Sequence, residues 1–193
     1  MLLVGTGVPP ERIDSALERW GMAMGPFRVL DVIGNDIPWQ ARRSRYGAAS
    51  GGPEWELADE VHDRGWLGRK SGLGWYDYRE VRSGAPNAEL AGLLDVRAGS
   101  QGGAAVDDAG IVDRCVLALV NEGAAVLADG VAASPGDIDV VFRNGFGFPA
   151  SRGGPMFHAD TLGLDRVVRR MRGFAATDPF FEPHPQLVAR AGA

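Results

Sequence analysis

Histidine and cysteine, which often act as bases, nucleophiles or zinc ligands, are few in this 193-residue sequence. It contains three histidines, His62, His158 and His184, and one cysteine, Cys115. These residues are far apart and form no His-x3-His or Cys/His cluster, so the sequence predicts no metal site. We expect Cys115 to pack on the apolar face of a long helix rather than to act as a nucleophile.

Each histidine has a structural interpretation. His62 is predicted in the middle of a helix, beside Asp63, where it would have a surface or capping role. His158 occupies a position at which the earlier, matching segment has Val29. This replacement indicates a position where a side chain only has to occupy space. His184 lies in a proline-rich C-terminal tail. We therefore predict no catalytic residue in the chain.

Three glycine-containing motifs resemble nucleotide-binding sequences but depart from them. Gly5-Thr6-Gly7 lacks the third glycine of the dinucleotide fingerprint and follows at most a four-residue strand. Gly145-Phe146-Gly147 is followed by Pro149 and has no strand before it. Gly68-Arg69-Lys70-Ser71 lacks the leading glycine of a phosphate-binding loop. No cofactor is expected to bind this chain alone.

The segment 65–78 is rich in glycine and aromatic residues. One interpretation is that its glycines let the chain turn closely over the domain while its aromatic side chains anchor it in apolar grooves. The anchoring residues would be Trp66, Trp75 and Tyr76. The alternative makes Arg69 and Lys70 an anion-binding pair for a phosphorylated ligand.

The overall composition excludes several classes of protein. The chain is 45% hydrophobic and carries a net charge of −5, which argues against nucleic-acid binding. The basic runs 42–45 and 169–172 are expected to be solvated helix faces. One cysteine excludes a disulfide scaffold, and no apolar stretch approaches the roughly 18 residues of a membrane span. No signal peptide is predicted, so we expect a cytoplasmic location, with an organelle matrix as the alternative.

The sequence repeats one pattern. Two segments read G-P-x4-D-x2-G-x-D, beginning at Gly25 and at Gly154, an offset of 129 residues. An Ile-Asp pair precedes each segment and ends at Asp14 or Asp139, an offset of 125 residues. The turn between the two parts is therefore longer in the second copy. We predict two copies of one supersecondary unit.

Most of the 28 glycines are expected to end helices or form tight turns, and helix start and stop signals surround them. The predicted helices are 9–20, 26–33, 53–64, 87–96, 108–129, 134–142 and 155–162. Period-two alternation is nearly absent, so the predicted fold class is all-α.

The small residues of 98–107 predict a flexible linker. It would separate a first helical repeat, 1–97, which contains the anchor segment 65–78, from a second repeat, 108–193.

The order of these motifs resembles the C-terminal domain of 3-hydroxyacyl-CoA dehydrogenases. The resemblance is strongest to the multifunctional enoyl-CoA hydratase/3-hydroxyacyl-CoA dehydrogenases of fatty-acid β-oxidation, which include the fatty-acid oxidation complex alpha subunits. The matching stretches are 13–14, 20–27, 31, 67–78, 113–124, 137–141, 145–149 and 152–157. The resemblance implies two tandem helical repeats of the 6-phosphogluconate dehydrogenase C-terminal-like type, the first lacking most of its first long helix.

The resemblance also implies an NAD-dependent oxidation in which a histidine acts as base and a glutamate orients it. In the family these residues and the dinucleotide-binding domain precede the region seen here, so this chain lacks them. The resemblance further implies an asparagine, in an Asn-Arg pair, that opens the long first helix of the first repeat; only the end of that helix, 1–7, is expected here, so the asparagine has no counterpart. The same place in the second copy is Asp113-Arg114, which departs from Asn-Arg. Asn121 lies later in the same predicted helix and is interpreted as structural.

Two functions follow as hypotheses. In the first, the chain is the C-terminal part of a β-oxidation dehydrogenase, inactive alone, that forms a wall of the acyl pocket and contacts the dinucleotide-binding domain or another subunit. The family's first Met-Gly-Pro turn faces that domain, so the resemblance nominates Met24, Gly25 and Pro26 for contact with 3-hydroxyacyl-CoA. In the second, the chain is a non-catalytic association module that docks in trans on a dinucleotide-binding domain or associates with itself.

Overall fold

The computed structural model describes residues 2–47, 55–101 and 106–192. The chain is mostly helical and divides into two compact units. The first comprises Met1–Glu18 and Met24–Asp107, and the second comprises Arg19–Ala23 and Asp108–Ala193. In the described ranges, no helix is both long and apolar enough to cross a membrane.

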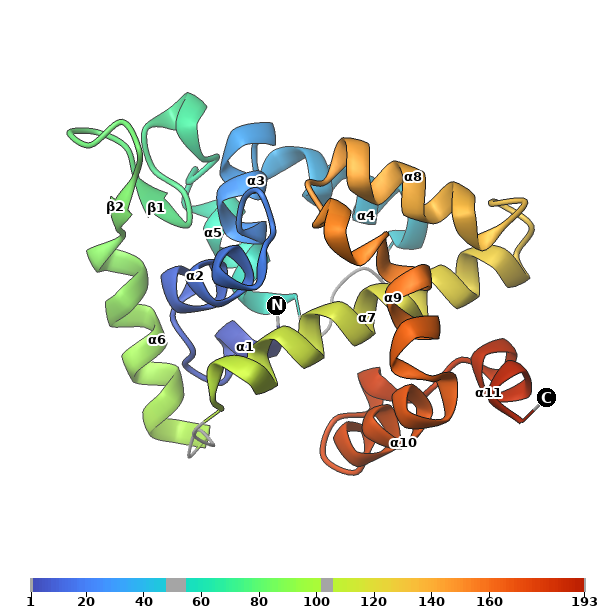
Figure 1. Cartoon of the computed structure of the whole chain (residues 1–193). Coiled ribbons are helices and arrows are strands. Elements are labelled where there is room, and N and C mark those ends of the chain that lie inside the picture. Colours follow the sequence, from blue (N-terminus) through green and yellow to red (C-terminus); the bar gives the residue numbers. More distant parts are fainter. Residues whose placement is uncertain (1, 48–54, 102–105, 193) are drawn as a thin grey trace. The chain divides into compact units, whose positions relative to one another are not determined.

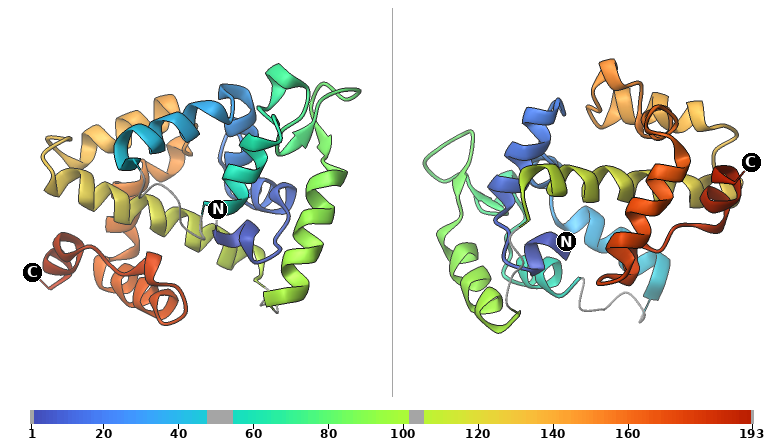
Figure 2. Two further views of the ribbon diagram at one scale, coloured as in Figure 1. Left: turned by 180° about the vertical axis from the view of Figure 1, so that it is seen from behind. Right: turned by 60° about the horizontal axis from the view of Figure 1, so that its bottom comes forward.

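The first unit is built from short helices (Figures 1 and 2). They are α1 (Leu2–Gly5), α2 (Pro10–Trp20, whose last two residues belong to the second unit), α3 (Pro26–Ile33), α4 (Asp36–Tyr46), α5 (Glu56–Asp63), the 3-10 helix η2 (Arg69–Ser71) and α6 (Ala88–Gln101). Two short strands, β1 (Tyr76–Asp77) and β2 (Ala85–Pro86), pair antiparallel, with Tyr76 opposite Pro86. This small sheet is an exception to the predicted all-α class.

The second unit is arranged around one long helix, α7 (Asp108–Ala128), which contacts α8, α9, α10 and α11 (Figure 1). The other elements are α8 (Pro135–Gly145), η3 (Ala150–Arg152), α9 (Pro155–Leu162), α10 (Leu164–Ala175), η4 (Pro179–Phe181) and α11 (Pro185–Ala191). Their core consists of Leu117, Val120, Ala124, Ala159, Val167, Val168, Met171 and Leu187. The apolar middle of α7 is buried because helices pack around it.

Local signals explain where several helices begin. Proline stands at the first position of α3 and of α9, and both helices have the predicted bounds. At α8 the Ser134 side chain accepts from the Asp137 backbone N–H, and the Asp137 carboxylate accepts from the Ser134 N–H. This capping box confirms the predicted start of α8.

Three expectations need correction. Residues 98–101, expected in the linker, continue α6, while 102–105 lie outside the described residues. The proline-rich C-terminal tail is instead helical, and it buries Phe181 and Leu187. Its prolines begin η4 and α11 because proline is favoured at a first helical position. In the basic run 42–45 on α4, Arg42 is buried rather than solvated.

Candidate functional site

The turn that begins α3 is held by a buried carboxylate. Asp14, on α2, is 1% exposed and accepts hydrogen bonds from the backbone N–H groups of Phe27 and Arg28, each at 3.0 Å. The Tyr76 hydroxyl donates to the same carboxylate at 2.8 Å. The first N–H groups of a helix have no partner within the helix, and a negative charge is favourable there. Asp14 therefore fixes α3 to α2.

The turn that begins α9 has the same construction. Asp139, on α8, accepts from the backbone N–H groups of Met156 at 2.8 Å and Phe157 at 3.0 Å. These donors are the second and third residues of α9, as Phe27 and Arg28 are of α3. The sequence shows the repeated aspartates, but the role of their carboxylates emerges only from the geometry.

Glycine is required before both prolines because the aspartate lies against the backbone. A Cβ added to Gly25 would lie 2.2 Å from the Cβ of Asp14, and one added to Gly154 would lie 2.4 Å from the Cβ of Asp139. Gly154 also has a φ of +124°, which side-chain-bearing residues rarely adopt. The Gly-Pro pairs thus allow close approach and then start a helix.

The segment 65–78 wraps around a second buried carboxylate, Asp31. This aspartate is 1% exposed and accepts from the backbone N–H groups of Trp75 and Tyr76, each at 3.0 Å. The Tyr78 hydroxyl donates at 3.1 Å and the Asn35 side-chain amide at 3.0 Å. Such a set of donors compensates a carboxylate that is removed from water.

The structure favours the anchor interpretation of this segment. Trp66, Trp75 and Tyr76 are buried. The ammonium of Lys70 is paired with Asp36 of the same unit. The Arg69 guanidinium lies over the Tyr78 ring, 5.3 Å from its centroid. Since both cations already have partners, the anion-binding pair is not the arrangement seen.

Burial dominates the electrostatics of these carboxylates. It raises the pKa of Asp14 to about 6, although the hydrogen bonds from Phe27, Tyr76 and Arg28 act in the opposite direction. Burial likewise raises the pKa of Asp31 and of Asp139 against their hydrogen bonds. Burial and the nearby Asp31 raise the pKa of Tyr78 to about 12.

The residues nominated for substrate contact lie at this first turn. Gly25 is buried, and Met24 and Pro26 are half-buried. The Gly25 N–H donates to Glu18 Oε1 at 2.9 Å. The backbone of Met24, Gly25 and Pro26 is therefore held from both sides, by Glu18 before α3 and by Asp14 at its start.

The histidines occupy three separate places. His62 stacks on Trp39, with ring centroids 4.0 Å apart. His158 packs edge-on against Trp20 at 5.3 Å, and burial, with the Arg152 charge, lowers its pKa. The His184 ring accepts from the Gln186 N–H and caps α11.

The structure also places the other candidate residues, Asp113, Arg114 and Cys115, on α7. Within the described residues, no group of three or more His, Cys, Asp or Glu side chains could hold a metal ion. Cys115 lies half-buried on α7 and forms no disulfide. Asp113 pairs with Arg170 at 2.7 Å, and Arg114 lies over Phe174.

Asn121 has a structural role. Its side-chain amide donates to the Glu182 carbonyl at 3.0 Å and its oxygen accepts from the His184 N–H at 2.7 Å. The side chain thereby ties α7 to the segment that enters α11.

The described residues do not fit a dinucleotide. A dinucleotide fold needs parallel strands joined through helices, whereas the strands in the described part are the antiparallel pair β1 and β2. Gly5 ends a helix, α1, rather than following a strand, and Gly145 ends α8. No reaction step can be assigned to NAD held by these residues.

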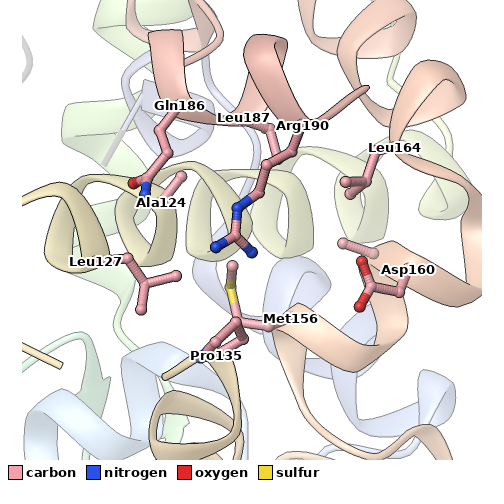
Figure 3. Close-up of a pocket in the computed structure, with 10 residues that line it drawn as sticks. Ala124, Leu127, Pro135, Met156, Asp160, Leu164, Gln186, Leu187 and Arg190 are labelled. Atoms are coloured by element: carbon pink, nitrogen blue, oxygen red, sulfur yellow. The ribbon is translucent and has the colours of Figure 1, made fainter. Parts of the chain in front are cut away.

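A small cavity in the second unit is lined by α7, α8, α9, α10 and α11 (Figure 3). Its volume is about 30 Å³, which suits water rather than an acyl group. The Arg190 side chain reaches across it toward Met156 (Figure 3). The buried Gln186 Oε1 finds no hydrogen-bond donor among the described residues.

Comparison with known proteins places this geometry in a family. The sequence model of the 3-hydroxyacyl-CoA dehydrogenase C-terminal domain matches residues 1–78 and 111–191. The chain belongs to this family. Each matched stretch contains one of the two turns that are held by a buried aspartate. The two turns are therefore part of the family domain rather than additions to it.

Curated relatives include much longer proteins. The peroxisomal bifunctional enzyme of Danio rerio is 37% identical over an alignment of 213 positions, gaps included, that covers 97% of this chain and 29% of that protein. The fatty acid oxidation complex subunit alpha of Vibrio vulnificus is 35% identical, covering 95% of this chain and 26% of that protein. The chain thus spans less than a third of the length of these relatives.

Solved structures agree on the fold. The dehydrogenase part of multifunctional enzyme 1 from C. elegans superposes with a TM-score of 0.72 at 25% identity, over 95% of this chain and 42% of that one. The 3-hydroxybutyryl-CoA dehydrogenase of Escherichia coli superposes with a TM-score of 0.67 at 22% identity, over 95% of this chain and 54% of that one. The family resemblance inferred from the sequence motifs is confirmed.

Proposed function

We propose that this chain acts as the C-terminal part of an NAD-dependent 3-hydroxyacyl-CoA dehydrogenase of fatty-acid β-oxidation, where it forms a wall of the acyl pocket. The observation that carries the proposal is the rigid turn at Met24, Gly25 and Pro26. Hydrogen bonds to Glu18 and Asp14 hold its backbone, while Met24 stays half-buried. A substrate-positioning surface must be held in this way because small displacements reduce catalysis strongly.

The two turns also support a duplicated fold. Asp14 with the start of α3, and Asp139 with the start of α9, make the same pair of hydrogen bonds to the same helical positions. We infer two tandem helical repeats, the first with little of its first long helix. The repeats correspond to the parts expected at 1–97 and 108–193.

NAD and the catalytic histidine and glutamate would come from a dinucleotide-binding domain, which is the partner proposed for this chain. The relatives named peroxisomal or glyoxysomal and those from bacteria show that the family works in more than one compartment. A cytoplasmic location for this chain stays a prediction.

The test joins this chain to the dinucleotide-binding domain of a relative and measures oxidation of 3-hydroxyacyl-CoA. We expect the assembly to be active and the chain alone to be inactive. Met24→Ala should raise KM for a medium-chain acyl substrate by roughly five- to tenfold, because truncating this half-buried side chain removes about 1–1.4 kcal/mol of apolar contact, less than the about 1.5–3 kcal/mol of a fully buried methionine. Met22→Ala is the matched control. An unchanged KM in Met24→Ala would contradict the acyl-wall assignment.

An association module remains a second candidate because of one surface feature. Three aliphatic side chains at the end of α3 and the start of α4 are about half exposed: Val32 at 49%, Ile33 at 49% and Ile37 at 51%. Neighbouring exposed aliphatic residues are typical of interaction surfaces. Sedimentation of the purified chain tests self-association. A monomer at all concentrations would contradict a self-associating module.

A further inference from the structure

The first unit contains a larger cavity that the proposed function does not use. It lies among α3, α4, α5 and the anchor segment, and its volume is about 260 Å³. The lining residues are Leu30, Asn35, Pro38, Trp39, Arg42, Trp55, Ala58 and Trp75. A cavity of about 150 Å³ in another protein binds benzene, so this one has room for roughly ten non-hydrogen atoms.

Two of the lining residues each carry a buried hydrogen-bond donor that is unused. The indole Nε1 of Trp39 and the guanidinium Nε of Arg42 have no acceptor among the described residues. Arg42 is 7% exposed; its Nη2 is paired with Asp59, and its guanidinium lies 4.8 Å from the Trp55 ring centroid. Buried donors almost always have a partner, so two on one cavity point to an absent acceptor.

Two other polar residues of the cavity, Asn35 and Trp75, are already paired. The Asn35 amide donates to Asp31 at 3.0 Å and to the Trp66 carbonyl at 2.8 Å, and its oxygen accepts from Trp75 Nε1 at 3.0 Å. Over the described part of its wall, the cavity therefore offers donors to a ligand. The molecule that completes it must supply an oxygen acceptor.

The shape of the wall indicates the rest of the ligand. Three tryptophans line the cavity, and aromatic side chains favour an aromatic ring that packs against them edge-on or offset. Trp39 is held by the stacked ring of His62 and by Arg43, whose guanidinium lies 4.9 Å from the Trp39 ring centroid. Trp39 and Arg42 are three residues apart on α4 and so share a helix face, which lets one polar group meet both donors.

We propose that this cavity binds a small planar aromatic molecule with one acceptor group, a carbonyl or a carboxylate, which accepts from Trp39 Nε1 and Arg42 Nε. The site is independent of the proposed dehydrogenase function, because it needs neither NAD nor a dinucleotide-binding domain. The paired Asp59 already balances the Arg42 charge, so a neutral carbonyl and a carboxylate are both compatible with the donors.

The experiment follows the indole N–H signals of the five tryptophans in the full chain by two-dimensional NMR. The probes are acetophenone, benzoate and ethylbenzene, which share a ring and differ in acceptor. We expect acetophenone or benzoate to shift the Trp39 signal downfield and to saturate near a millimolar dissociation constant, as ligands of this size do. Trp75 lines the same cavity but already donates to Asn35, so its signal should move less.

Ethylbenzene provides the decisive comparison in the unmodified chain. It should bind roughly five- to tenfold more weakly than the better of the two oxygen-bearing probes, since it leaves both donors unpaired. A carbonyl is assigned if acetophenone binds better and a carboxylate if benzoate does. Equal binding of ethylbenzene, or no saturable shift of the Trp39 signal with either oxygen-bearing probe, would overturn the proposal.

A variant then tests the donor itself. Trp39→Phe keeps a ring but removes Nε1, so the affinity for the better oxygen-bearing probe should fall roughly fivefold while that for ethylbenzene stays the same. Arg45→Gln is the matched control, because Arg45 is an exposed arginine of the same helix that does not line the cavity and whose guanidinium lies over Tyr46 rather than Trp39. Dispersed signals from the other four tryptophans would show that the variant is folded.

Discussion

The turns that begin α3 and α9 are each held by an aspartate at the equivalent position, but the two aspartates differ in what covers them. Asp14 is 1% exposed and also binds the Tyr76 hydroxyl, whereas Asp139 is 9% exposed. The repeat offset pairs Asp31 with Asp160, and here the contrast is greater. Asp31 is enclosed by the anchor segment, while Asp160 is exposed at the small cavity of the second unit. The first unit therefore stabilises its turn through buried polar contacts that the second unit does not need.

The largest expected effect comes from the glycines that precede the two prolines. Gly154→Ala should lower the free energy of unfolding by about 4 kcal/mol, because its Cβ meets Asp139 and its φ is unfavourable. Gly25→Ala should lower it by about 2–3 kcal/mol, since it has the clash without the positive φ. Urea unfolding of both variants measures the difference.

Gly130 supplies the control for that comparison. It has a φ of +68° but nothing within 4 Å of an added Cβ, so Gly130→Ala should lower the free energy of unfolding by only about 1 kcal/mol. If Gly130→Ala were as damaging as Gly154→Ala, backbone conformation rather than contact with the aspartate would be responsible.

Removing the aspartates should also affect the first turn more. Asp14→Ala leaves three donors without an acceptor and should lower the free energy of unfolding by about 3 kcal/mol. Asp139→Ala leaves two donors, and water reaches them more easily, so about 1–2 kcal/mol is expected. Thermal unfolding of the two variants compares them, and equal losses would show that the Tyr76 contact contributes nothing.

Local and distant determinants explain how much of this could be predicted from the sequence. The bounds of α3 and α9 depend on a proline at the start and a glycine at the end, so they are readable from adjacent residues. The surroundings of Asp31 are not readable in this way, because its donors in the anchor segment lie 44 to 47 residues away. The donors of Trp39 and Arg42 were missed for the same reason, as their neighbours in the cavity come from separate elements.

The stability of the first unit should also depend on pH. Burial raises the pKa of Asp14 from the 3.8 of an ordinary aspartate to about 6 in the folded chain, so the folded state binds the proton more tightly. Its contribution to stability is complete below pH 4 and is lost as the pH rises through 6, by roughly 2–3 kcal/mol.

Comparison of the unmodified chain with Asp14→Asn isolates this contribution, because the other titrating groups are shared. The stability of Asp14→Asn relative to the unmodified chain should improve between pH 4 and pH 7. Asp139→Asn should change in the same direction, since burial raises the pKa of Asp139 as well. A relative stability of Asp14→Asn that falls over this range would contradict the raised pKa.

Calorimetric titration of NAD into the purified chain tests the central claim most directly. The account assigns the dinucleotide to a separate domain, because the described residues lack the parallel strands and glycine turn that hold it. It predicts no saturable heat with the chain alone. Binding of NAD by the chain alone with a micromolar dissociation constant would contradict the account.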